Sequence, residues 1–183
     1  MEDINIAKEC SNWNLENFWI LYDRYIDKIY KFVFLKTSSK EVSEDITQDV
    51  FMSAIKNITK FKIDANSSVQ AWIYKIASNK VIDYYKTNKE TGEIWDYLEM
   101  WVIENFWENL DNKEKLKEVF EYLKNYKKEH REIFILRIWD DLSYAEISQI
   151  TGQSVDNCKK IVSRTLKTIN ANFVILLLTL IFT

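Results

Sequence analysis

The sequence predicts an all-α protein in which two small helical domains are joined by an acidic linker. Its 183 residues include no proline and only two glycines, Gly92 and Gly152, and strands with tight turns usually need those residues. Charge also divides the chain, because residues 1–89 carry a net charge of +1, residues 90–111 carry −7 and residues 112–183 carry +3. The middle segment is therefore the predicted linker between two mildly basic flanks.

Three or four helices are expected in the first domain, which spans residues 14–89 after an N-terminal tail of residues 1–13. Trp72 is interpreted as a core residue of this domain in preference to a surface on which bases stack. A polar loop over residues 64–68 precedes the helix that contains Trp72. Apolar residues recur at helical spacing over residues 15–36, 42–58 and 69–86.

The second of these helices has a polar side that carries Asp45, Asp49 and Met52, with Gln48 beside them. Two carboxylates four residues apart most often belong to a solvated helix face. Their acidic character equally suits a charged partner surface, and the residues alone leave both interpretations open.

The linker, residues 90–111, is rich in large aromatic side chains. Each of them would leave a large apolar area in water, so docking is expected, and docking within this chain is favoured over docking on a partner. These residues are Trp95, Tyr97, Trp101, Phe106 and Trp107.

The second domain, residues 112–172, contains the pattern of a helix-turn-helix. Ser143 and Glu146 predict a capping box at the start of a short helix, and Gly152 predicts its left-handed end. Ser154 then caps a longer helix. A short capped helix, a glycine-bearing turn and a second helix are typical of DNA-binding proteins. Helices are expected over residues 113–127, 129–139, 143–150 and 154–171.

The last of these helices has an apolar side and a basic side. The side expected to pack inward carries Cys158, Ile161, Val162 and Ile169. The opposite side and its margins carry Asn157, Lys159, Lys160, Ser163, Arg164 and Lys167. Lysine and arginine bind phosphates, and arginine, asparagine and serine also read base edges, so DNA recognition is favoured over a solvated basic face.

Few residues of this chain could perform catalysis. The single histidine, His130, lies beside two charged residues and is interpreted as a solvated helix residue. Cys10 and Cys158 match neither a metal-ligand spacing nor a disulfide framework, which favours a reduced, intracellular compartment. The acidic, polar N-terminus is not that of a secretory signal. An enzyme is the function class that the sequence supports least.

Residues 44–51 (EDITQDVF), residues 71–86 (AWIYKIASNKVIDYYK) and residues 112–170 follow one another in an order that is typical of one family. They resemble, respectively, the polymerase-binding part of sigma region 2, the promoter-melting part that follows it, and sigma region 4. The chain thus resembles bacterial RNA polymerase sigma factors of the extracytoplasmic-function (ECF) subfamily over residues 14–172. The middle domain of larger sigma factors has no counterpart here.

The resemblance implies a cytoplasmic, non-enzymatic factor that binds RNA polymerase core at its clamp helices and flap and directs promoter-specific initiation. It also implies an anti-sigma factor as a partner, and neither a metal nor a cofactor. The core-binding residues would be Asp45, Gln48, Asp49 and Phe51. The residues that contact the promoter −10 element would be Asp64, Asn66, Ser67, Ser68, Lys75, Asn79, Lys80 and Lys86. Those that contact the −35 element would be Ser154, Asn157, Lys159, Lys160, Ser163, Arg164 and Lys167.

The C-terminal tail, residues 173–183, does not fit this pattern. Residues 173–182 are apolar except for Thr179, and ten helical residues cover only about half of a bilayer's hydrocarbon core. Packing onto the helical domains or self-association is favoured, while a peripheral membrane contact and the stump of a longer span stay open. Two other functions also stay open: a helix-turn-helix regulator that acts without polymerase, and a membrane-associated helical adaptor.

Overall fold

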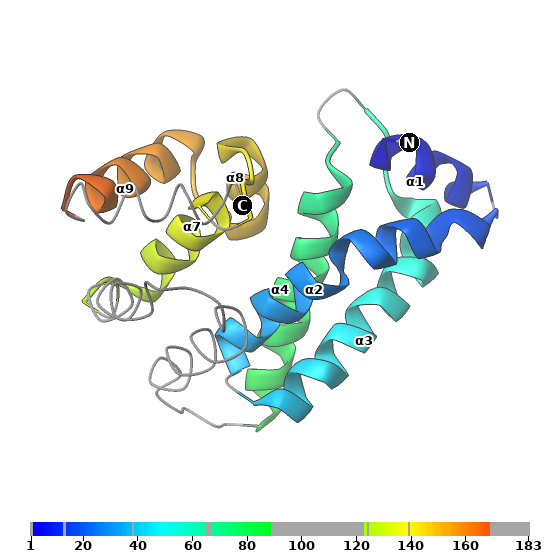
Figure 1. Cartoon of the computed structure of the whole chain (residues 1–183), viewed down its shortest axis with the longest axis horizontal. Helices are drawn as coiled ribbons and strands as arrows, with labels where there is room; N and C mark the ends of the chain where they lie inside the picture. Colours follow the sequence, from blue (N-terminus) through cyan, green and yellow to red (C-terminus); the bar gives the residue numbers. More distant parts are fainter. Residues whose placement is uncertain are drawn as a thin grey trace, which may run out of the picture. The chain divides into compact units, whose positions relative to one another are not determined.

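A computed structural model of the chain describes residues 2–12, 14–37, 39–64, 67–88, 123, 125–138 and 140–168. Throughout these residues the regular structure is helical, which confirms the predicted all-α fold (Figure 1). The chain divides into two compact units, Met1–Ile94 and Trp95–Thr183. The expected linker, most of the expected helix at 113–127 and the apolar tail lie outside the described residues.

Three long helices form the centre of the first unit, and each packs against the other two (Figure 1). They are α2 (Phe18–Thr37), α3 (Lys40–Asn57) and α4 (Val69–Asn88), with the short 3₁₀ helices η1 (Leu15–Asn17) and η2 (Ile58–Lys60) beside them. Side chains from all three are fully buried, including Leu21, Ile29, Val50, Ile73 and Tyr74. Full burial of one such side chain contributes roughly 1.5–3 kcal/mol to stability.

The residues expected to form an N-terminal tail instead form a helix, α1 (Asp3–Ser11), which packs against α2, η2 and α4. Ile6, Ala7 and Cys10 are all 0 % exposed, and the Asp3 carboxylate binds Arg24 and the hydroxyl of Tyr25 on α2. This corrects the expectation of a tail. A short segment with few apolar residues makes a weak periodic signal. A helix of this length is stabilised mainly by tertiary packing, here against η1, α2, η2 and α4.

Serine hydroxyl groups mark where two of these helices begin. The Ser39 hydroxyl accepts a hydrogen bond from the amide of Val42, 3.4 Å away, at the start of α3. The Ser68 hydroxyl accepts one from the amide of Ala71, 3.1 Å away, at the start of α4. Both helices therefore begin where a side chain replaces a missing backbone acceptor.

The second unit is described as three helices, α7 (Lys128–Ile138), α8 (Tyr144–Thr151) and α9 (Val155–Thr168), of which each pair is in contact. Its core draws on all three, through Ile133, Phe134, Leu136, Ile147, Ile150, Cys158 and Val162. The expected helices at 129–139 and 143–150 are confirmed to within one residue at each end. The helix expected over residues 154–171 is confirmed as far as residue 168, where the described residues end.

Among the described residues, no helix is both long enough and apolar enough to span a membrane.

Candidate nucleic-acid and polymerase interfaces

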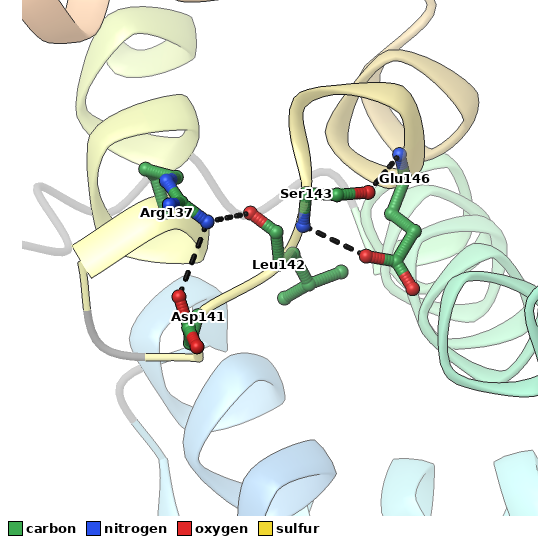
Figure 2. A network of polar contacts seen from close by, with 5 residues as sticks. All are labelled: Arg137, Asp141, Leu142, Ser143 and Glu146. Carbon is green, nitrogen blue, oxygen red and sulfur yellow. Dashed lines mark hydrogen bonds and ion pairs between the residues drawn. The ribbon is translucent and has the colours of Figure 1, made fainter.

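The connection between α7 and α8 is held by Arg137, in the last turn of α7 (Figure 2). Its guanidinium donates hydrogen bonds to the carbonyl oxygen of Leu142 (2.9 Å) and to Oδ1 of Asp141 (3.1 Å). It also lies 5.2 Å from the ring centroid of Tyr144, within the range of a cation–π contact. Arg137 therefore fixes the path of the chain into α8. The sequence pattern did not single it out, because a cation in the last turn of a helix is too common to indicate a role.

The predicted capping box is present at the start of α8. The Ser143 hydroxyl accepts a hydrogen bond from the Glu146 amide (3.2 Å), and the Glu146 carboxylate accepts one from the Ser143 amide (2.7 Å; Figure 2). At the other end Gly152 has φ 75° and donates its amide to the Ser148 carbonyl at 2.9 Å. The Ser154 hydroxyl then accepts from the Asn157 amide at 3.2 Å and begins α9. Local hydrogen bonds thus fix both ends of α8 and the start of α9, which form the predicted helix-turn-helix.

Helix α9 separates a buried side from an exposed basic side. The buried residues are Cys158, Ile161, Val162 and Thr165. The exposed residues, which we call the α9 basic face, are Lys159, Lys160, Ser163, Arg164 and Lys167. Four cations on one solvent-facing side of a helix can bind the phosphates that flank a DNA groove.

Two residues near the start of α9 differ from those of the α9 basic face. Asn157 is half-buried, and its side-chain amide donates to Oε1 of Gln153 at 2.9 Å. Asp156, in the first turn, lies 3.9 Å from the ammonium of Lys159. Gln153 was not among the predicted site residues. It holds Asn157 in one orientation, and a glutamine in the turn before a recognition helix gives no signal of its own in the sequence.

The predicted −10 residues on α4 lie on its solvent side. Lys75, Asn79 and Lys86 are exposed, as their spacing of four and seven residues predicts. Lys86 lies 3.5 Å from Oδ1 of Asp83. Lys80 is half-buried, because its ammonium reaches Asp49 of α3 at 3.2 Å. We call these four predicted residues the α4 basic face.

Trp72 lies at the edge of the core. It is half-buried, and its ring packs against that of Phe61 with centroids 5.0 Å apart. This position agrees with its interpretation as a packing residue, and the sequence could not have identified Phe61 as its partner.

The loop before α4 uses its serine side chains to shape its own backbone. The Ser67 hydroxyl donates to the Lys62 carbonyl (2.6 Å) and accepts from the Asp64 amide (2.9 Å). The Ser68 hydroxyl caps α4, and the Asp64 side chain is exposed. Asn66, which was also predicted to contact DNA, lies outside the described residues.

Three of the four predicted core-binding residues share the exposed side of α3. Asp45, Gln48 and Asp49 are exposed and form what we call the α3 polar face. Phe51 is instead 3 % exposed and packs edge-on against the ring of Tyr22, with centroids 4.8 Å apart. Its prediction as a contact residue is wrong, since two residues beyond Asp49 a helix has turned about 200° and points the side chain toward α2.

Known proteins match the chain over both units. Residues 21–91 match the family model of sigma-70 region 2, and residues 127–169 match that of sigma-70, region 4. The ECF RNA polymerase sigma factor SigM of Bacillus subtilis is 29 % identical over 145 residues, which cover 79 % of this chain and 87 % of SigM. The ECF RNA polymerase sigma factor BldN of Streptomyces coelicolor is 28 % identical over 159 residues, which cover 83 % of this chain and 58 % of BldN.

This chain belongs to the ECF sigma factors. It therefore acts in promoter-specific transcription initiation with RNA polymerase. Two solved structures share its fold. CnrH, in complex with the cytosolic domain of CnrY, has a TM-score of 0.63 and 19 % identity. The match covers 90 % of this chain and 92 % of the CnrH chain. The sigma factor RpoE of Bartonella quintana, in complex with the anti-sigma factor NepR, has a TM-score of 0.58 and 22 % identity. The match covers 90 % of this chain and 98 % of the RpoE chain.

Proposed function

We propose that this sigma factor binds polymerase core through the α3 polar face, the −10 element through the α4 basic face and the loop before it, and the −35 element through the α9 basic face. The factor has no catalytic activity of its own and works in the cytoplasm, where RNA polymerase acts. The observation that carries this assignment is α9, whose cations are exposed opposite a buried apolar side and directly after a capped helix and a left-handed glycine.

The α9 basic face suits insertion into the major groove. Lys159, Lys160 and Lys167 supply sequence-independent attraction for phosphates, which makes binding depend on salt. Arg164 and Ser163 carry donors that can reach base edges, arginine favouring guanine. Asn157 is held by Gln153 and begins the same surface. The negative charge of Asp156 would repel phosphate, which favours a slanted entry of the helix into the groove.

The α4 basic face suits the opened strand of the −10 element. Its lysines bind the backbone as point charges, while Asn79 can donate and accept hydrogen bonds with a base or sugar. In the loop before α4, the serine hydroxyls maintain the backbone shape that would receive an unstacked base, and the exposed Asp64 borders it.

The α3 polar face suits a cationic partner surface. Asp45 and Asp49 are solvent-exposed carboxylates one turn apart with Gln48 beside them, so a partner can reach all three from one direction. The polymerase clamp helices are the proposed partner of this face, and the polymerase flap is the proposed partner of the second unit.

An anti-sigma factor is a proposed further partner. In two solved structures of the same fold, CnrH is bound to the cytosolic domain of CnrY and the sigma factor RpoE is bound to the anti-sigma factor NepR. A protein that covers the exposed faces of this chain would block polymerase and promoter together.

Abortive transcription with purified bacterial core polymerase and a pool of native promoter fragments tests the whole assignment. The full chain is expected to give promoter-selective initiation, and the variant Asp45→Ala/Gln48→Ala/Asp49→Ala is expected to abolish it. The control Asp23→Ala/Asp27→Ala also removes two exposed carboxylates, from α2, and should initiate normally.

The same assay tests the α9 basic face. Arg164→Ala is expected to lower initiation about fivefold or more, because one base or phosphate contact is lost, whereas the exposed Lys127→Ala should have little effect. If no variant or wild-type chain initiates while the protein binds particular duplexes alone, the chain is a regulator that acts without polymerase. If the protein neither initiates transcription nor binds particular duplexes, a membrane-associated helical adaptor is the favoured function.

A further inference from the structure

One ion pair joins the two faces proposed for different partners. The ammonium of Lys80, on the α4 basic face, lies 3.2 Å from Oδ2 of Asp49, on the α3 polar face, although the two residues are 31 positions apart in the sequence. The Lys80 side chain is 34 % exposed and that of Asp49 is 67 % exposed, so a partner can reach both groups. A residue assigned to polymerase binding is thus neutralised by a residue assigned to DNA binding.

We propose that the Asp49–Lys80 pair couples the two interfaces, so that engagement of Asp49 by polymerase core releases Lys80 for the promoter backbone. This inference rests on the proposed function of the α3 and α4 faces. In the free protein, each group is satisfied by the other. Core binding supplies Asp49 with an external cation, and the ammonium of Lys80 then becomes available to phosphate.

The sign of the coupling follows from the charges. A carboxylate that already neutralises one ammonium attracts a second cation less strongly, so Lys80 opposes core binding. An ammonium beside a carboxylate attracts phosphate less strongly, so Asp49 opposes DNA binding until core engages it. By linkage, core and DNA then favour each other's binding by the same factor.

The size of the effect is limited by exposure. Ion pairs at a protein surface are weak and screened by salt, so the expected change in affinity is only about two- to fivefold at low ionic strength. A change in affinity of this size is small for a single interface. Its direction is the one that makes the protein bind promoters better when it is on polymerase than when it is alone.

One variant, Lys80→Met, tests the proposal because it should change the two affinities in opposite directions. Methionine keeps an unbranched side chain of similar length while removing the charge. The full chain carrying it should bind core polymerase about two- to fivefold more tightly at low salt, and the resulting holoenzyme should bind promoter fragments more weakly. Core affinity is measured by titrating labelled factor with core, and promoter affinity by titrating labelled fragments with holoenzyme.

The matched control is Lys75→Met, which removes an exposed cation from the same face of α4. It should weaken promoter binding and leave core affinity unchanged, which separates the local pair from a general change in net charge. The tighter core binding of Lys80→Met should also disappear when Asp49→Ala is present, because a double-mutant cycle isolates the pair.

The outcomes separate this proposal from the function on which it rests. If Asp49→Ala weakens core binding but Lys80→Met does not strengthen it, the coupling is wrong and the α3 polar face stands. If Asp49→Ala leaves core binding unchanged, the assignment of Asp49 to polymerase fails, and the coupling fails with it. If Lys80→Met tightens core binding without weakening promoter binding, Lys80 is no DNA contact and the coupling is overturned.

Discussion

At Gly152 the chain turns from α8 into α9 with φ 75° and ψ 4°, a conformation that costs a residue with a side chain about 1–2 kcal/mol. A Cβ atom at this position would meet no atom within 4 Å beyond the adjoining backbone and the two neighbouring residues. The requirement for glycine is therefore one of backbone conformation and not of space. Single residues such as Gly152 and Arg137 decide how α9 is presented, although neither lies on the α9 basic face.

Substitution of Gly152 should separate these two requirements. Gly152→Ala is expected to lower the free energy of unfolding by about 1 kcal/mol, and Gly152→Asn by less, since asparagine tolerates the left-handed region. Urea unfolding followed by circular dichroism measures both variants. Equal stability of wild type and Gly152→Ala would show that the turn does not need this conformation.

At the scale of the helices, each amphipathic element buries one side and leaves the other for binding. Helix α3 buries Val50 and Ala54 and exposes Asp45 and Asp49, and α9 divides in the same way. Helix α1 has a different role, because its apolar side completes the first unit. It lies before residue 21, where the match to sigma-70 region 2 begins.

The packing of α1 can be tested by a cavity-forming substitution. Ile6 is 0 % exposed, so Ile6→Ala should lower the free energy of unfolding by about 2–4 kcal/mol, as large-to-small changes in a core do. Lys8→Ala, at an exposed position of the same helix, should change stability by less than about 0.5 kcal/mol. Urea unfolding of the full chain measures both. A tail that did not pack would make the two variants indistinguishable.

At the scale of the whole molecule, the two cysteines provide one buried thiol in each unit, Cys10 in the first and Cys158 in the second. Burial raises the pKa of both thiols above the ordinary value, and for Cys10 the charge of Glu9 adds to the effect. The thiolate is the reactive form, so a raised pKa lowers the reactive fraction at pH 8. Each thiol therefore reports whether its own unit is folded.

Thiol labelling should be slow in the native protein, because both thiols are buried and the pKa of each is raised. At pH 8 each cysteine is expected to react with a disulfide reagent about tenfold more slowly, or slower still, than after unfolding in urea, and the native rate should rise with pH above 8. Cys10→Ser and Cys158→Ser assign the two rates in a stopped-flow measurement. A native thiol that reacted as fast as the unfolded one would mean that its unit is open in solution.

The features that depend on residues within about one helical turn of each other could be predicted from the amino-acid sequence. Helical periodicity predicted α2, α3 and α4, and the capping box and Gly152 predicted how α8 begins and ends. These signals are local, because backbone hydrogen bonds, caps and side-chain faces of a helix join residues three to four positions apart.

The contacts between helices could not be predicted from the sequence. In the tertiary structure Phe51 packs against Tyr22, α1 packs against the other helices of the first unit, and Lys80 lies 3.2 Å from Asp49. A residue at the margin of a helix face can point to solvent or to a neighbour, and the amino-acid pattern is the same in both cases. The packing of distant segments selects between them, because burial and ion pairing depend on which surfaces meet.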